Sequence, residues 1–194
     1  SDFAHSLPGY SGPAAWLSVP RKLGEERRGQ SKSRPVEAQA LVAELKRLMD
    51  SAEGRELTFG VISFYKEQVS AIEDVLVDVG IVVRTEESTE IVEPYRELLL
   101  PNGRVAERLR FGTVDAFQGM EFDVVFLSMV RSNTRGSFGH VTSPNRLCVA
   151  MSRQKRLLIV AGDDGMLRTP NAPQGISPLV EFRKLSEVRD AARV

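Results

Sequence analysis

Short apolar runs rich in β-branched and aromatic residues recur along the chain, separated by segments with a helical pattern. The runs at residues 57–63, 123–130 and 156–162 are dominated by apolar side chains. Such a run predicts a strand buried on both faces, which in practice means a strand inside a mostly parallel sheet. Further strands are predicted at residues 15–19, 81–83 and 109–114.

Amphipathic helices are predicted in the intervals between these strands. The first begins at Pro35, which suits a first helical turn, as Glu37 suits its positive end. Its apolar residues recur at the spacing of a single helical face, namely Leu41, Val42, Leu45, Leu48 and Met49. Further helices are predicted over residues 65–79 and 144–153, and a charged helix from about residue 177 into the tail.

Strands that alternate with helices predict an α/β fold, here a single doubly wound, mostly parallel sheet with helices on both faces. Residues 35–194 are assigned to this domain, with a right-handed β-α-β unit over residues 57–83. Residues 85–108 are Glu-rich and interrupted by proline, so an insertion that carries a hairpin or a loop is expected. Residues 1–34 are expected to be an N-terminal segment or linker that adds an edge strand. The chain begins without Met, which suggests a piece of a longer protein.

The overall charge does not select a partner. Lys and Arg number 26 and Asp and Glu number 26, so no net charge draws nucleic acid to the chain as a whole. Any such binding must come from a local patch. Residues 21–34 are mostly basic and residues 86–97 are mostly acidic. A solvated loop is the ordinary explanation of such a run, especially for the acidic one.

Cysteine and histidine content limits the chemistry. The single cysteine, Cys148, excludes an internal disulfide and suits a reducing compartment such as the cytoplasm. Its neighbours are apolar, so packing is expected for its side chain rather than reactivity. Two histidines far apart in the sequence argue against a zinc site, and no metal site is predicted in this chain. No apolar run reaches the roughly 20 residues of a membrane span, so no membrane partner is expected.

Residues 111–131 carry the first candidate site, a glycine-containing turn followed by a buried strand. Gly119 has no side chain, so a phosphate could approach the backbone closely there. Gln118 and Glu121 flank it, and a carboxylate in this position would serve a ribose hydroxyl or a coupled cation. The alternative is a capped turn with a solvated Glu. A second motif downstream favours the ligand site.

The second motif spans residues 145–155, a helix that leads into the strand at 156–162. Arg153 projects from the end of this helix, near the amino end of the following strand. Because ligands of open α/β sheets bind at the carboxyl ends of the strands, the target of Arg153 is expected to belong to a neighbouring domain. An Arg presented in this way could stabilise charge on a transferring γ-phosphate. The alternative is a surface Arg paired with Asp or Glu.

Together the two motifs resemble motifs V and VI of superfamily 1 helicases, in the branch that includes the nonsense-mediated decay helicase and senataxin. Residues 113–123 match motif V and residues 146–153 match motif VI. Residues 60–68 match motif IV, and residues 33–38 match the element that opens the second RecA-like domain. Four motifs in this order make the resemblance specific. It implies a RecA-like fold.

The resemblance also implies roles for individual residues. Arg153 matches the arginine finger, and Glu121 and Gly119 match nucleotide contacts. Further nucleotide contacts are expected from Gln118, Arg34 and Gln68. Nucleic acid is expected to be bound through its phosphates rather than its bases, by Thr113, Ser63, Tyr65, Arg131, Asn145 and Arg146. The chain departs from the family pattern at Cys148, where Asn is frequent, at Lys155, where a second Arg is common, and at Arg34, which takes the place of an Asn.

The sequence contains no Gly-x-x-x-x-Gly-Lys-Ser/Thr loop and no Asp-Glu strand end for magnesium. It therefore contains the half of an ATPase site that closes over nucleotide bound elsewhere. The resemblance implies ATP and Mg²⁺ as cofactors of the full-length enzyme, bound mainly by its first RecA-like domain, the expected partner of this one. The expected function is the C-terminal motor domain of an ATP-dependent helicase or translocase that moves 5′→3′ on single-stranded DNA or RNA and is inactive alone.

Two other functions stay open at this point. A scaffold domain that binds nucleic acid or protein without an ATPase partner would also lack the phosphate loop. A receiver- or phosphatase-like domain could use Asp163 and Asp164, which are better explained as the loop after the last strand. A phosphate loop in the upstream reading frame would distinguish the helicase from the scaffold. The helicase interpretation requires Glu121 and Arg153 to lie on one rim of the sheet and to face outward.

Overall fold

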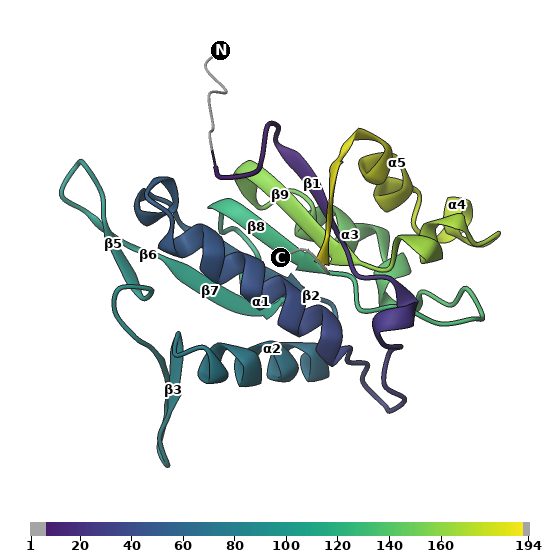
Figure 1. Ribbon diagram of the computed structural model, residues 1–194, viewed down its shortest axis with the longest axis horizontal. Coiled ribbons are helices and arrows are strands. Elements are labelled where there is room, and N and C mark those ends of the chain that lie inside the picture. Colours follow the sequence, from purple (N-terminus) through teal and green to yellow (C-terminus); the bar gives the residue numbers. More distant parts are fainter. Residues whose placement is uncertain (1–6, 192–194) are drawn as a thin grey trace.

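The computed structural model describes residues 7–191, and its centre is a six-stranded parallel sheet (Figure 1). The strands lie in the order β10-β1-β9-β8-β2-β7. Their bounds are β1 Ala14–Ser18, β2 Phe59–Ser63, β7 Leu109–Thr113, β8 Phe122–Ser128, β9 Gln154–Gly162 and β10 Glu187–Asp190. The prediction of an α/β fold built on a parallel sheet is confirmed.

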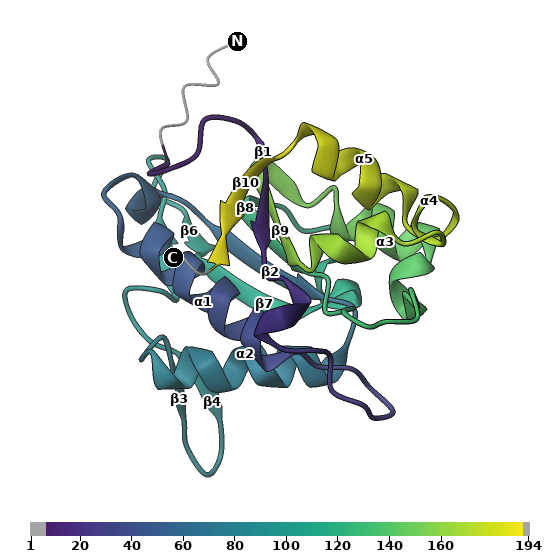
Figure 2. The same cartoon turned by 45° about the vertical axis from the view of Figure 1, so that its right-hand side comes forward.

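Helices cover both faces of this sheet (Figures 1 and 2). One face carries α1 (Pro35–Asp50) and α2 (Lys66–Asp78), and the other carries α3 (Pro144–Ala150), α4 (Ala172–Gly175) and α5 (Ser177–Leu185). Short 3₁₀ turns connect the elements, namely η1 Arg21–Leu23, η2 Glu53–Glu56, η3 Val114–Phe117, η4 Gly139–Thr142 and η5 Asp164–Arg168. The sheet is therefore doubly wound, as its helical and apolar pattern predicted.

The core consists of two layers, one on each face of the sheet. Along β8, Val124 and Phe126 pack with the layer under α1 and α2, whereas Val125 and Leu127 pack with the layer under α3 and α5. Successive strand residues point to opposite faces, so a strand covered on both sides must be apolar throughout. This is the physical reason for the uninterrupted apolar runs.

The strand predicted at the sheet edge lies inside the sheet. β1 pairs with β9 on one side and with β10 on the other, so that Trp16 lies between Val160 and Val188. The tail was expected to be helical through Val188, but α5 ends at Leu185 and β10 follows. On this side of the sheet the outermost strand is β10, and its alternation of half-buried and exposed residues is typical of an edge strand.

The β-α-β unit expected over residues 57–83 is wrong in its last strand. β3 (Val82–Arg84) pairs antiparallel with β4 (Thr89–Ile91) outside the main sheet, and β5 (Glu97–Leu99) pairs with β6 (Val105–Glu107) as a second hairpin. The strand that follows α2 in the sheet is β7, parallel to β2. Val82 alone is buried in β3, whereas Val83 and Arg84 are exposed, because the hairpin lies outside the main sheet and is not covered on both faces.

Cys148 is exposed, contrary to the packing expected from its apolar neighbours. The buried face of α3 carries Leu147 and Ala150, and the residue directly after Leu147 points away from it. In the part of the chain that the structure describes, no helix is long and apolar enough to cross a bilayer.

Candidate functional site

A parallel sheet brings all amino ends of its strands to one edge and all carboxyl ends to the other, here called the amino edge and the carboxyl edge. Residues 118–121 lead into β8, and Arg153 directly precedes β9. β8 and β9 are neighbours, with Phe122 paired to Gln154. Glu121 and Arg153 therefore lie side by side at the amino edge.

The Arg153 guanidinium is held by carbonyl and hydroxyl oxygens. Its Nε donates to the Val149 carbonyl at 3.1 Å and its Nη1 to the Met120 carbonyl at 3.4 Å, while Nη2 donates to Ser152 Oγ at 3.0 Å. It thereby joins the end of α3 to the loop before β8. Among residues 7–191 no carboxylate pairs with it, so its positive charge is not neutralised. Within the described residues, Arg153 is therefore not a surface arginine paired with Asp or Glu, which was the alternative explanation of this residue.

The loop before β8 is open to solvent. Gly119 has a φ of +76°, a left-handed conformation that favours glycine, and a Cβ placed there would meet nothing within 4 Å. Gln118 and Glu121 are exposed, and within the described residues the Glu121 carboxylate has no hydrogen-bond or ion-pair partner. A cleft of about 960 Å³ separates this loop from the β5–β6 hairpin, with Glu121 and Lys155 in its wall. A cleft of this size is ordinary for small-molecule sites.

Arg34, expected to contact nucleotide, lies in the interior. Its side chain is fully buried, with Nη1 3.2 Å from Glu37 Oε2. Nε donates to the Gly24 carbonyl and Nη2 to the Pro20 carbonyl. Every nitrogen of the guanidinium therefore already has a protein partner. The expectation is corrected, because a fully buried guanidinium presents nothing to a ligand.

Gln68 is corrected for the same reason. Its Oε1 accepts the Arg34 N–H at 2.7 Å and its Nε2 donates to Ser128 Oγ at 3.0 Å, inside the protein. Ser128 is the carboxyl end of β8, whereas Glu121 precedes its amino end. At about 3.3 Å per residue the two ends of this strand are roughly 20 Å apart. Gln68 thus belongs to a buried polar network and not to the nucleotide edge.

Glu37 is the centre of this network and was missed as a site by the sequence. Its Oε1 accepts the Ser128 hydroxyl at 2.6 Å and the Val130 N–H at 2.8 Å. Burial raises the pKa of Glu37, against the opposing influence of Arg34 and these donors. Val130, two residues after the end of β8, has a φ of +66°, which is strained for a β-branched residue, and Glu37 stabilises that conformation. The i, i+3 spacing of Arg34 and Glu37 at the start of a helix was the sequence pattern that could have indicated this ion pair.

At the carboxyl edge, three expected nucleic-acid residues are buried. Ser63 is fully buried, and its Oγ accepts the Tyr65 N–H at 3.3 Å. The Tyr65 hydroxyl donates to the Phe138 carbonyl and accepts from Arg131 Nη1 and the His140 N–H. Arg131 itself is only 5% exposed. The expectation that these side chains contact nucleic acid is corrected, because their polar atoms form hydrogen bonds inside the protein.

The three other residues expected to bind nucleic acid are accessible to solvent. Thr113, at the end of β7, is half-buried and level with Ser63 in the neighbouring strand. Asn145 is exposed, and Arg146 is half-buried with its Nη2 3.2 Å from the exposed carboxylate of Asp115. An exposed ion pair of this kind is weak, so a phosphate could displace it.

Glu26 is a second residue that sequence reasoning missed. Its carboxylate receives Arg131 Nε at 2.9 Å and Nη2 at 3.0 Å, the Ser132 N–H at 2.8 Å and Asn133 Nδ2 at 3.1 Å. Burial raises the pKa of Glu26, but these hydrogen bonds outweigh burial and hold it below its ordinary value. The partners are more than 100 positions apart in the sequence, so no local pattern reveals the pair.

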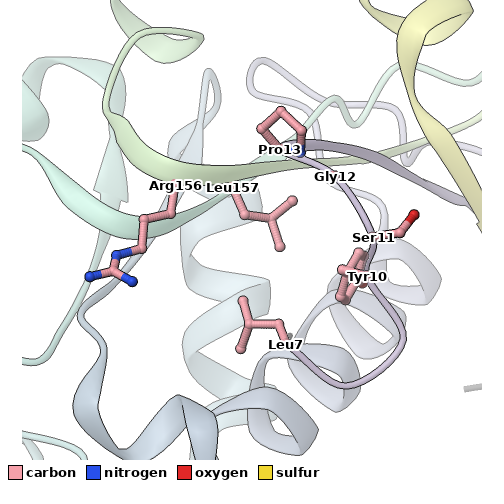
Figure 3. A pocket seen from close by; sticks show the side chains of 7 residues that line it. All are labelled: Leu7, Tyr10, Ser11, Gly12, Pro13, Arg156 and Leu157. Carbon is pink, nitrogen blue, oxygen red and sulfur yellow. The ribbon is translucent and has the colours of Figure 1, made fainter. Parts of the chain in front are cut away.

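A small pocket under the N-terminal segment lies at the amino ends of β1 and β9 (Figure 3). Its volume is about 50 Å³, and its lining includes Leu7, Tyr10 and Leu157. The Tyr10 hydroxyl donates to Glu44 at 2.6 Å, and the Arg189 guanidinium lies 4.9 Å from the Tyr10 ring centre. Burial and then Glu44 raise the pKa of Tyr10. This contact fastens the N-terminal segment to α1 and β10 and leaves no space for a nucleotide.

The six-stranded parallel sheet, with a glycine turn, a free carboxylate and an unpaired guanidinium at the starts of adjacent strands, defines a RecA-like domain. Residues 3–165 match the family model described as the AAA domain, which is most of the chain. The chain belongs to this family and, by its motifs and relatives, to the second RecA-like domains of superfamily 1 helicases in the nonsense-mediated decay and senataxin branch.

The chain is similar to several helicases and related proteins. It is 43% identical over 63 residues to the helicase required for RNAi-mediated heterochromatin assembly 1 of Schizosaccharomyces pombe, covering 32% of this chain and 6% of that protein. It is 35% identical over 113 residues to the DNA polymerase alpha-associated DNA helicase A of Saccharomyces cerevisiae, covering 58% of this chain and 13% of that protein. It is 39% identical over 66 residues to the regulator of nonsense transcripts 1 homolog of Drosophila melanogaster, covering 34% of this chain and 6% of that protein. The chain thus spans 13% or less of these relatives.

Proposed function

We propose that this chain is the second motor domain of an ATP-dependent superfamily 1 helicase or translocase that acts on single-stranded nucleic acid. The observation that carries the proposal is the Arg153 guanidinium, which lies at the amino edge beside Glu121 without an acidic partner among residues 7–191. An unneutralised charge in a fixed position suits the triphosphate of a nucleotide bound by a facing domain.

The amino edge has the donors and acceptors that ATP, the substrate, needs from a second domain. Arg153 would face the charge that develops on the γ-phosphate, Glu121 the ribose hydroxyls or the γ-phosphate network, and Gly119 the phosphates through its open backbone. The Mg²⁺ ion is assigned to the first RecA-like domain. In the described part of this chain, no three His, Cys, Asp or Glu side chains gather in a way that could ligate a metal.

Strand binding is assigned to the carboxyl edge. Thr113, Asn145 and Arg146 are accessible there and can contact phosphates, which carry no base information. Both DNA and RNA present such phosphates. The two edges are opposite ends of the same strands, so a rigid movement of the sheet on closure over ATP would also move the bound nucleic acid.

An assay of the isolated chain tests whether ATP hydrolysis requires the first RecA-like domain. With ATP and Mg²⁺, in the presence and absence of single-stranded nucleic acid, the purified chain is expected to release no phosphate above the buffer rate. The physical reason is that this sequence contains neither a phosphate loop nor an Asp-Glu strand end for magnesium. Turnover that disappears in Arg153→Ala would contradict the proposal, because the chain would then contain a whole ATPase site.

The carboxylate of Glu121 has its own test in the full-length protein. Glu121→Ala is expected to raise the KM for ATP about ten- to hundredfold with a smaller change in kcat. A hydrogen bond to a charged group contributes about 1.5–3 kcal/mol, and a ribose contact is made equally in the bound and transition states. Glu90→Ala, an exposed carboxylate on the β3–β4 hairpin, serves as control. An unchanged KM in Glu121→Ala would make Glu121 a solvated turn residue.

A further inference from the structure

The basic run noted in the sequence is a loop at the carboxyl edge. It comprises residues 21–32, here called the basic loop, which joins the carboxyl end of β1 to α1 (Figures 1 and 2). The loop carries five basic residues, namely Arg21, Lys22, Arg27, Arg28 and Lys32, against the two acids Glu25 and Glu26.

The base of the basic loop is fixed to the sheet. The Glu26 carboxylate is bound by Arg131 and by the two residues that follow it, and the Glu26 N–H donates to the Ser132 carbonyl at 3.3 Å. The Arg27 N–H donates to the Ser33 carbonyl at 2.7 Å, which closes the loop on itself. The loop is therefore ordered before any ligand binds, which lowers the entropic cost of a contact.

The positive charges of the basic loop are largely unpaired. Arg27, Arg28 and Lys22 are exposed and have no acidic partner among the described residues. Arg21 lies 3.7 Å from Glu25, and both side chains are about half exposed, which makes a weak pair. Glu26 points inward to Arg131 and does not neutralise its neighbours. A fixed loop with free guanidinium groups favours a polyanion, because guanidinium binds phosphate in two-pronged geometry.

The basic loop lies on the same edge as Thr113. The Glu67 N–H at the start of α2 donates to Ser31 Oγ at 3.3 Å, and Glu26 contacts the residues that follow β8. β8, β2 and β7 are consecutive in the sheet and level at Ser128, Ser63 and Thr113. Strands lie about 5 Å apart, so roughly 10 Å separate the ends of β7 and β8. One strand of nucleic acid that contacts Thr113 can continue across β2 to the loop.

We propose that the basic loop contacts the phosphates of the single strand through Arg27 and Arg28. Arg131 acts as a positioning residue, which fixes the loop through Glu26 and does not touch the strand. The inference rests on the proposed function, because it extends the nucleic-acid surface at the carboxyl edge.

The double variant Arg27→Gln/Arg28→Gln tests the contact. Binding of labelled oligothymidylate and oligouridylate to the 194-residue chain is measured over a series of salt concentrations. Each phosphate contact on a single strand contributes about −0.7 to the slope of log K against log salt, so the variant is expected to lose about 1.4 from the slope and to bind both oligomers more weakly. The matched control Arg55→Gln/Arg104→Gln removes the same charge from exposed residues near the amino edge. Its slope is expected to stay unchanged.

Glu26→Ala tests the positioning role. Removal of a negative charge beside a phosphate site would strengthen binding if charge alone mattered, whereas loss of the fixed loop base weakens it. We expect weaker binding, in a variant whose far-ultraviolet spectrum still shows the fold. Tighter binding would overturn the positioning role of Glu26 and Arg131.

The outcomes separate the two proposals. If the wild-type chain binds the oligomers with a steep salt slope and Arg27→Gln/Arg28→Gln binds identically, the basic-loop contact is wrong and the strand-binding function stands. An equal loss in the control variant would show an effect of overall charge and would also overturn the contact. If the folded wild-type chain binds neither oligomer at low salt, strand binding by this domain is wrong, and the loop contact falls with it.

Discussion

Replacement of Arg153 by alanine in the full-length protein is expected to lower kcat for ATP hydrolysis about 10³-fold or more. The guanidinium lies at the amino edge with its charge unpaired in the described chain, and an arginine that meets the γ-phosphate stabilises charge that develops only in the transition state. The KM for ATP is therefore expected to change little. Steady-state phosphate release at saturating nucleic acid measures both constants.

Two further variants make the Arg153 experiment specific. Arg153→Lys keeps the charge but loses the planar fork that reaches the Val149 and Met120 carbonyls, so most of the loss in kcat is expected to persist. Arg168→Ala removes an arginine that is 73% exposed at the other edge, and its turnover is expected to equal that of the wild type. Wild-type turnover in Arg153→Ala would remove this residue from the mechanism, and an equal loss in Arg168→Ala would indicate a general charge effect.

Replacement of Glu37 by alanine is expected to lower the free energy of unfolding by about 3–5 kcal/mol, the usual cost of removing one partner from a buried ion pair. Arg34 would keep its charge in the interior without a carboxylate, and the Ser128 hydroxyl and the Val130 N–H would lose their acceptor. For a domain of this size the Tm should fall roughly 6–20 °C. Urea unfolding and calorimetry of the isolated chain measure both quantities.

The second helix of the domain supplies a matched control. Glu67 also lies in the first turn of its helix, α2, but is exposed. Glu67→Ala should therefore cost less than about 1 kcal/mol, the value of a charge at a helix end. The double variant Arg34→Met/Glu37→Ala should recover part of the lost stability, because it removes the unpaired buried charge. A loss no larger in Glu37→Ala than in Glu67→Ala would show that the buried network contributes little.

The fold class could be predicted because it depends on local periodicity. The inner parts of β2, β8 and β9, residues 59–62, 124–127 and 157–161, contain no polar side chain, and α1 and α2 repeat their apolar residues at helical spacing. Helix and strand formation respond to these patterns within a few residues. β10 and β3 were misjudged because Glu187–Asp190 and Val82–Arg84 are short and contain charged residues. Such segments take their structure from the strand that happens to lie beside them.

The candidate site divides in the same way. Glu121 and Arg153 stand directly before a strand and Gly119 stands three residues before one, and the order of chain elements alone puts such residues at the amino edge once the sheet is parallel. Arg34, Gln68, Tyr65 and Arg131 carry the same polar chemistry, yet the structure buries all four. A polar side chain next to a strand end can face solvent or a buried partner, and both choices look alike in the sequence.

The sequence by itself determined the buried strands, the main helices, their alternation and the order of four helicase motifs, because these depend on neighbours along the chain. Only the tertiary structure decided the order of strands in the sheet and which polar groups meet. The carboxylates of Glu26 and Glu37 reach Arg131, Ser128 and Val130 across 91–105 positions. Burial of a charge is favourable only when such a distant partner neutralises it. Whether such a partner lies nearby depends on the tertiary structure. It therefore separates the buried residues that support the carboxyl edge from the exposed residues that can bind nucleic acid there.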